Sequence, residues 1–106
     1  MTKHERFEDL PFQQHAIKIG VMIYKLVDSE SLVSDYRVKN QLIGSAISIS
    51  NNIAEGFEYN RNRQFIRYLE ISKGSAGELR SQLFLLLSAV KITTETYQVH
   101  YMSLVD

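Results

Sequence analysis

The stretch SAISISNNIAEGF, residues 45–57, decides the fold of this chain. Read at helical spacing together with the residues before it, its apolar side chains fall on one side of a helix. These apolar residues are Val38, Leu42, Ala46, Ile49, Ile53 and Phe57. A second stripe, of small and hydrogen-bonding side chains, runs beside the first: Gln41, Ser45, Ser48, Asn52 and Glu55. Small residues next to an apolar stripe favour a close partner helix, so the stretch predicts one half of a tight helix pair.

The partner helix is predicted from residue 62 onward. Its apolar or small positions repeat at alternating spacings of four and three: Phe65, Leu69, Ser72, Ala76, Leu79, Leu83, Leu86 and Val90. Polar residues precede several of them, namely Ser75, Glu78 and Gln82. The connection over residues 58–61 is short enough to make the two helices antiparallel. The helix spans roughly thirty residues, or about 45 Å.

Two further helices complete the predicted bundle. Residues 12–27 form the first, with a seam at Phe12, Ala16, Ile19, Ile23 and Leu26. Ile17, Val21 and Tyr24 widen its apolar arc, which indicates more than one neighbour. Residues 93–105 form a short last helix with Tyr97, Tyr101 and Leu104 on one side. The sequence therefore predicts an all-α fold, an antiparallel up-and-down four-helix bundle that forms one domain over residues 1–106. Because the fourth helix is short, part of the surface of the first and third helices is expected to remain uncovered.

Turn-forming residues predict the helix ends. Pro11 suits a first helical position, where its missing N–H is not needed, and residues 1–9 are expected to fray. Ser31 or Ser34 is expected to cap the second helix. Gly56 is expected to end that helix in a left-handed conformation, and Asn60 or Asn62 to cap the third. Since a mid-helix glycine costs about 1 kcal/mol, Gly74 and Gly77 predict a closely approaching backbone.

The composition limits the classes of function. The chain has 106 residues, of which 44% are hydrophobic and 23% charged, as in ordinary globular domains. It contains no cysteine, which excludes disulfides, thiol nucleophiles and thiolate metal sites. Lys and Arg number 12 and Asp and Glu 12, so no net charge attracts nucleic acid or anionic lipid. The charged N-terminus is not a secretory signal, and no apolar run is long enough to span a membrane. A cytoplasmic location is expected.

Three blocks of this sequence resemble a known family. Residues 48–56 (SISNNIAEG), 64–69 (QFIRYL) and 74–83 (GSAGELRSQL) are similar to the signature blocks of the 23S rRNA intervening-sequence proteins, a bacterial four-helix-bundle family. Shorter likenesses extend the resemblance over about residues 7–90, at residues 9–10, 23–26 and 41–42. The resemblance implies a four-helix bundle that assembles into a homopentamer and has no known catalytic activity.

Related accessory subunits of diversity-generating retroelements pair with a reverse transcriptase and RNA. The resemblance therefore also implies that this chain could bind an RNA or protein partner. The sequence departs from the family pattern in ways that bear on this point. Ser50 stands where a proline is usual, and Ile43-Gly44 replaces an arginine-rich stretch. The retroelement branch is basic, whereas this chain is neutral, which argues against RNA binding.

Five polar residues beside the two seams, here called the polar edge, are the first candidate site: Gln41, Asn52, Glu55, Glu78 and Gln82. Its two glutamates, Glu55 and Glu78, could act as a carboxylate pair in acid–base catalysis, but no histidine or cysteine accompanies them. The favoured interpretation is structural, with buried polar groups that set helix register. Glu55 is then expected to pair with Arg61, Arg63 or Arg67, and Glu78 to face Gln41 or Ser45, or groups on the first helix or another subunit.

Basic residues of the third helix are the second candidate site. Arg61, Arg63, Arg67, Lys73 and Arg80 could contact RNA, although an outward charge run is more often a solvated face. Tyr97 and Tyr101 could stack bases, but aromatic residues at helical spacing are more often part of a core. His4, His15 and His100 lack the spacing of a metal site, and no Glu-x-x-His motif is present. No catalytic, metal or cofactor site is predicted.

The prediction for function is a non-catalytic homo-oligomer, pentameric by resemblance, that acts as a scaffold or adaptor. The alternative is an RNA-binding accessory factor that uses the basic residues around the third helix. A continuous basic face on the assembled oligomer would favour the alternative.

Overall fold

The computed structural model describes residues 6–105, and these contain four α-helices and no strand. The elements are η1, a 3-10 turn (Phe7–Asp9), α1 (Pro11–Val27), α2 (Tyr36–Glu58), α3 (Asn62–Ser88) and α4 (Thr94–Val105). The predicted all-α fold with a shorter fourth helix is confirmed. Of the residues expected to fray, 7–9 form η1 instead, and 1–5 lie outside the described part, as does His4.

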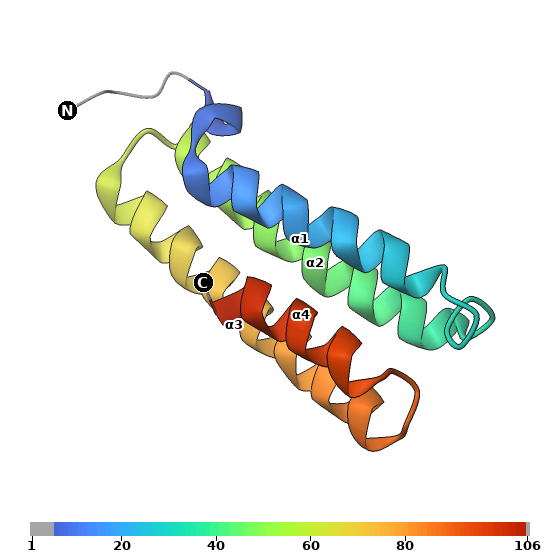
Figure 1. The fold of residues 1–106 in the computed structure, drawn as a ribbon. Helices are drawn as coiled ribbons and strands as arrows, with labels where there is room; N and C mark the ends of the chain where they lie inside the picture. The colour runs from blue at the N-terminus through green and yellow to red at the C-terminus, as the bar shows by residue number, and fades with distance from the viewer. Residues whose placement is uncertain (1–5, 106) are drawn as a thin grey trace.

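Successive helices run antiparallel and side by side (Figure 1). The α1–α2 pair packs beside the α3–α4 pair, and α4 folds back along the second half of α3 only (Figure 1). With 12 residues against 27, α4 leaves about four turns of α3 without a fourth-helix neighbour. None of the described helices has the length and apolarity that crossing a membrane requires.

The core lies between the seams predicted from the sequence. Ile23, Leu42, Leu79 and Leu83 are almost fully buried, as is Leu32 in the turn between α1 and α2. α2 and α3 share the most extensive packing, and small residues line their contact. Ser45 and Ser72 are both 5% exposed, which is unusual burial for serine. Two of the predicted seam positions are exposed, however: Phe12 on α1, and Val90, which lies beyond the end of α3.

The N-terminal caps differ from the prediction. α1 begins at Pro11, as expected. The cap of α2 is Asp35, whose side chain accepts a hydrogen bond from the backbone N–H of Val38 at 3.2 Å, so the prediction of Ser31 or Ser34 was wrong. Asp is as good a cap as Ser because its carboxylate reaches the same unpaired N–H groups. α3 follows Arg61 with no side-chain cap, which contradicts the predicted asparagine caps.

The hairpin between α2 and α3 is built differently from the prediction. Gly56 lies inside α2 and is helical, and the left-handed residue is Asn60, with φ of 52°. Asparagine tolerates this conformation better than most residues. Gly56 is needed for space instead, because a Cβ there would lie 2.7 Å from the Cβ of Tyr68 on α3. The close approach predicted at Gly74 and Gly77 is therefore at Gly56.

Gly74 and Gly77, in contrast, have open surroundings. A Cβ at Gly74 would meet nothing within 4 Å, and one at Gly77 would meet only the guanidinium of Arg80 at 3.6 Å. The prediction that these two residues admit a close backbone within the protomer was wrong. At this level, Ser72 and Ser75 make the close contacts with α2 instead.

Candidate functional site

A ladder of side-chain hydrogen bonds joins α2 to α3 along the polar edge. Ser45 donates to the carboxylate of Glu78 at 3.3 Å, and the hydroxyls of Ser48 and Ser75 are 2.8 Å apart. Asn52 donates back to the carbonyl of Ser48 at 2.7 Å. On the core side, Ser72 donates to the carbonyl of Ile49 at 2.8 Å. These hydrogen bonds, some between two side chains and some from a side chain to the backbone, thus set the register of α2 against α3.

The members of the polar edge have different surroundings. Glu78 lies opposite Ser45, one of its two partners on α2 that the sequence predicted. Glu55 makes no ion pair within residues 6–105, where the ion pairs are Arg6–Asp9 and Lys39–Asp28. The predicted pairing of Glu55 with an arginine is therefore not present. The side-chain oxygen of Gln82 is buried without a hydrogen-bond partner.

Two small cavities flank this ladder on the outer side of α2 and α3. The first, of about 290 Å³, is lined by Asn40, Gln41, Gly44, Ser45, Ser48, Ser75 and Glu78. The second, of about 230 Å³, is mostly apolar and is lined by Arg37, Val38, Gln41, Leu42, Gln82, Leu85 and Leu86. Gln41 is common to both. The hydroxyl, amide and carboxylate groups of the first cavity can hold a small polar molecule.

The five candidate RNA-contacting residues do not share one surface. Arg61, Arg63 and Arg67 are exposed at the hairpin end of α3. Lys73 is six residues beyond Arg67, which places it about 120° around the helix axis. It lines a groove beside α1 instead. Arg80 is half-buried, near Gly77. The basic residues are therefore divided between two sides of α3.

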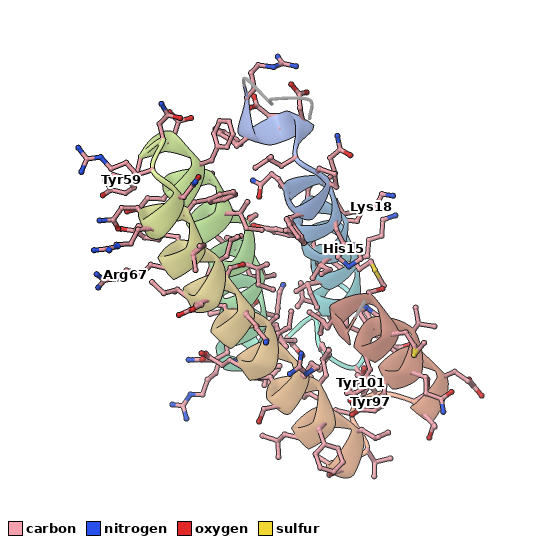
Figure 2. All side chains as sticks on the ribbon, turned by 90° about the vertical axis from the view of Figure 1, so that its left-hand side faces the viewer. His15, Lys18, Tyr59, Arg67, Tyr97 and Tyr101 are labelled. Carbon is pink, nitrogen blue, oxygen red and sulfur yellow. The ribbon has the colours of Figure 1, made fainter. Side chains whose placement is uncertain are left out.

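A stacked tyrosine pair lies beside the hairpin arginines. The rings of Tyr59 and Tyr68 are 5.5 Å apart between centroids and 13° from parallel. Figure 2 shows Tyr59 and Arg67 on the same side of the molecule. Interaction with the Tyr59 hydroxyl, and next with the carboxylate of Glu55, raises the pKa of Tyr68 above its ordinary value. Glu55 thus lies near Tyr68, a neighbour that no spacing in the sequence indicated.

A larger apolar groove of about 430 Å³ opens between α1 and α3, where α4 ends. Its lining is Phe12, His15, Ala16, Ile19, Ile49, Ile53, Leu69, Ser72, Lys73, Ala76 and Leu104. His15 Nε2 donates to the carbonyl of Ser103 at 2.6 Å and so joins α1 to the last turn of α4. The sequence predicted an uncovered surface on the first and third helices, but it did not predict this hydrogen bond between α1 and α4.

The remaining histidine and aromatic candidates have structural neighbours. His100 Nδ1 is 2.7 Å from the carbonyl of Thr96 in its own helix. Tyr97 lies between Phe84 and Tyr101, with ring centroids 6.2 and 5.6 Å away. Figure 2 shows Tyr97 and Tyr101 together on α4, away from Tyr59 and Arg67. Among residues 6–105, no three or more His, Cys, Asp or Glu side chains are grouped as metal ligands would be.

Comparison with known proteins identifies a family and a similar solved structure. The curated proteins contain no match to this sequence. A crystal structure of a protein of unknown function from the S23 ribosomal protein family of Bacteroides thetaiotaomicron aligns with a TM-score of 0.78 and 26% identity, over 89% of this chain and 88% of that one. The family model described as 23S rRNA-intervening sequence protein matches residues 8–105. The chain therefore belongs to the 23S rRNA-intervening sequence protein family.

Proposed function

We propose that this chain is a non-catalytic subunit of a homo-oligomer, a cyclic pentamer, that serves as a cytoplasmic scaffold or adaptor. The supporting observation is a row of apolar side chains on the outer side of α1. Ile17, Val21 and Tyr24 follow one another at helical spacing and are 52%, 47% and 51% exposed. They face away from the core, so packing within the protomer does not account for them. Exposed apolar rows of this kind are typical of interaction surfaces.

A second exposed apolar surface lies on α3. Ile71 and Leu85 are 43% and 68% exposed, and Leu85 also lines the cavity that contains Gln41 and Gln82. A ring of identical subunits needs two different surfaces on each subunit, one for each neighbour. The outer sides of α1 and α3 meet that requirement. The polar edge then acts within the protomer, where its hydrogen bonds hold the α2–α3 pair in register.

Light scattering coupled to size exclusion tests the assembly. The parent is expected at about five times the 12.2 kDa protomer. Val21→Glu places a charge in the exposed row and is expected to lower the mass to that of the protomer. Gln98→Glu, which places the same charge at an exposed position of α4, is the matched control and is expected to leave the mass unchanged. A parent mass of 12.2 kDa at every concentration would contradict the proposal.

RNA binding is the second candidate function, and the Tyr59–Tyr68 stack favours it. Aromatic faces beside arginines are a frequent platform for single-stranded bases. Arg61, Arg63 and Arg67 lie at the same end of α3 as the stack. If RNA binds there, Arg67→Ala and Tyr68→Ala both weaken binding to a labelled single-stranded RNA, and only the arginine variant reduces its salt dependence. Equal binding by parent and both variants would exclude this surface.

A further inference from the structure

The mostly apolar cavity of about 230 Å³ between α2 and α3 lacks a hydrogen-bond donor. Gln82 is part of its lining, and the side-chain oxygen of Gln82 is buried without a partner, which is costly until a donor reaches it. The volume is below the range of about 300–1,000 Å³ that is usual for small-molecule pockets, and it suits one inserted side chain. Arg37 at the cavity would repel a cationic side chain. Tyrosine and tryptophan are the apolar side chains that carry a donor, and this chain contains no tryptophan.

Tyr24 is an exposed tyrosine whose ring and hydroxyl are unused. It is 51% exposed and belongs to the outer apolar row with Ile17 and Val21. Ser103 of α4 contacts Met22, and Tyr24 lies about 200° further around the helix axis, so it points away from α4. Within residues 6–105, the other exposed tyrosines each have a ring or a cation beside them: Tyr36 with Lys39, Tyr59 with Tyr68, and Tyr101 with Tyr97.

Tyr24 and the cavity lie at the same height of the bundle. The α1–α2 turn and the α3–α4 turn are at one end of it (Figure 1). Lys39 of α2 is 3.9 Å from Asp28, which follows Tyr24 by one turn, and the cavity at this end is lined by Val38 and Leu86. In a ring whose axis runs along the helices, rotation to the next subunit leaves the height of a residue unchanged. Tyr24 of one subunit is therefore level with the cavity of its neighbour.

The charges at the edges of the two surfaces are opposite. Arg37 lines the cavity, is exposed, and forms no ion pair within residues 6–105. Asp28 lies one turn beyond Tyr24, just after the end of α1, and its side chain is 74% exposed although Lys39 is 3.9 Å away. With Tyr24 in the cavity of a neighbour, Asp28 comes close to Arg37 at the start of α2. Opposite charges at the rim favour this alignment of the two surfaces.

We propose that the cavity between α2 and α3 receives Tyr24 of the adjacent subunit. The phenol ring packs against Leu85, and the hydroxyl donates a hydrogen bond to Gln82 Oε1. Asp28 of the inserting subunit pairs with Arg37 of the receiving subunit. This inference rests on the homo-oligomer proposed above and names the contact that joins its subunits. The contact is heterologous, since α1 of each subunit faces the α2–α3 side of the next, as a ring requires.

A mixture of two full-length variants isolates one copy of this contact. Val21→Glu breaks the α1 surface and keeps the cavity, whereas Leu85→Glu breaks the cavity and keeps Tyr24. Each variant alone is expected to be a protomer, and the two together form a pair whose Kd is measured by analytical ultracentrifugation. In the Leu85→Glu chain, Tyr24→Phe is expected to raise this Kd about fivefold, as loss of one hydrogen bond does. Tyr101→Phe, at an exposed position of α4, is the matched control and leaves the Kd unchanged.

Paired substitutions make the result specific to the named residues. Gln82→Met in the Val21→Glu chain removes the same hydrogen bond, so combining it with Tyr24→Phe is expected to weaken the pair no more than either change alone. Arg37→Glu in that chain is expected to raise the Kd, and Asp28→Lys in the other chain to restore it. An unchanged Kd for Tyr24→Phe, multiplied effects of Tyr24→Phe and Gln82→Met, or the absence of any pair would overturn the proposal.

The mass of the parent by light scattering separates this proposal from the assembly. A parent oligomer, together with the expected changes in Kd, supports both. A parent oligomer whose variant pair is indifferent to Tyr24→Phe, or which neither Val21→Glu nor Leu85→Glu dissociates, means that the tyrosine contact is wrong while the oligomer stands. A parent that stays at 12.2 kDa at every concentration overturns both, because the occupant of the cavity is a second copy of the chain.

Discussion

Glycine has opposite effects on stability at two positions of this chain, because the space around the two Cα atoms differs. Gly56 lies against the first turns of α3, where a Cβ would be 2.7 Å from the Cβ of Tyr68 and 3.2 Å from the ring of Phe65. Neither neighbour is the free end of a flexible side chain, so the two helices would have to separate. Gly74 lies in the middle of α3 with nothing nearby, and there the missing side chain only weakens the helix.

Alanine at these two positions should therefore have opposite effects. We expect Gly56→Ala to lower the free energy of unfolding by about 1–3 kcal/mol, as overpacking does. Gly74→Ala should raise it by up to about 1 kcal/mol, since alanine is the better helix former. Urea denaturation measures both, with each variant serving as the other's control. A Gly56→Ala protein as stable as the parent would show that the hairpin has room for the methyl group.

At the scale of elements, the helices differ in how they are held. α2 and α3 are joined along most of their length by buried seams and by the serine ladder. α4 has 12 residues, which is marginal for a helix without tertiary support. Its packing is against the far half of α3 and the edge of α1. The hydrogen bond from His15 to the carbonyl of Ser103 joins the last turn of α4 to α1.

We expect His15→Ala to loosen α4 selectively. Loss of this bond should lower the opening free energy of the last turns of α4 by about 1 kcal/mol. Amide hydrogen exchange would report the change as faster exchange near Ser103, with α2 and α3 unaffected. Lys18→Ala, one turn further along α1, is the control. Faster exchange throughout the bundle would mean that His15 supports the whole fold rather than α4.

At the scale of the whole molecule, the proposed ring requires two different contact surfaces on each subunit, whereas a two-fold dimer requires one. Each subunit of a ring uses one surface toward one neighbour and a different surface toward the other. The outer apolar residues of α1 and α3 lie on different helices, separated by the core. Breaking one surface leaves the other intact, and the two halves of a broken ring remain complementary.

Mixing two defective variants tests this arrangement. Val21→Glu and Leu85→Glu should each be found at the protomer mass by light scattering. Mixed in equal amounts, they should form pairs of twice that mass and nothing larger, because only one intact surface of each kind remains. Pairs formed by either variant alone would indicate a two-fold interface. Leu85→Glu that assembles like the parent would remove α3 from the proposed ring.

Helix type and pairing were predictable from the sequence because both depend on local periodicity. The seams Leu42–Ile49–Ile53 and Leu79–Leu83–Leu86 repeat at helical spacing, and a short connection can join such helices only in antiparallel fashion. Helix ends were less predictable. Asp35 and the serines before it are comparable caps, and only the path of the turn decides which side chain reaches a free N–H. Gly56 fitted a C-cap from its sequence, but the helix continues past it.

Contacts between distant residues were decided only by the tertiary structure. Glu55 has arginines within a few residues along the chain, yet the fold places it beside Tyr68. Phe12 has the spacing of a core residue, but it is 65% exposed, because burial depends on neighbours outside residues 11–27. The sequence by itself determined four helices, their order and their seams, because a helix is a local structure. The groove, the histidine link and the division of the basic residues required the packing of elements far apart in the chain, and only the tertiary structure supplies it.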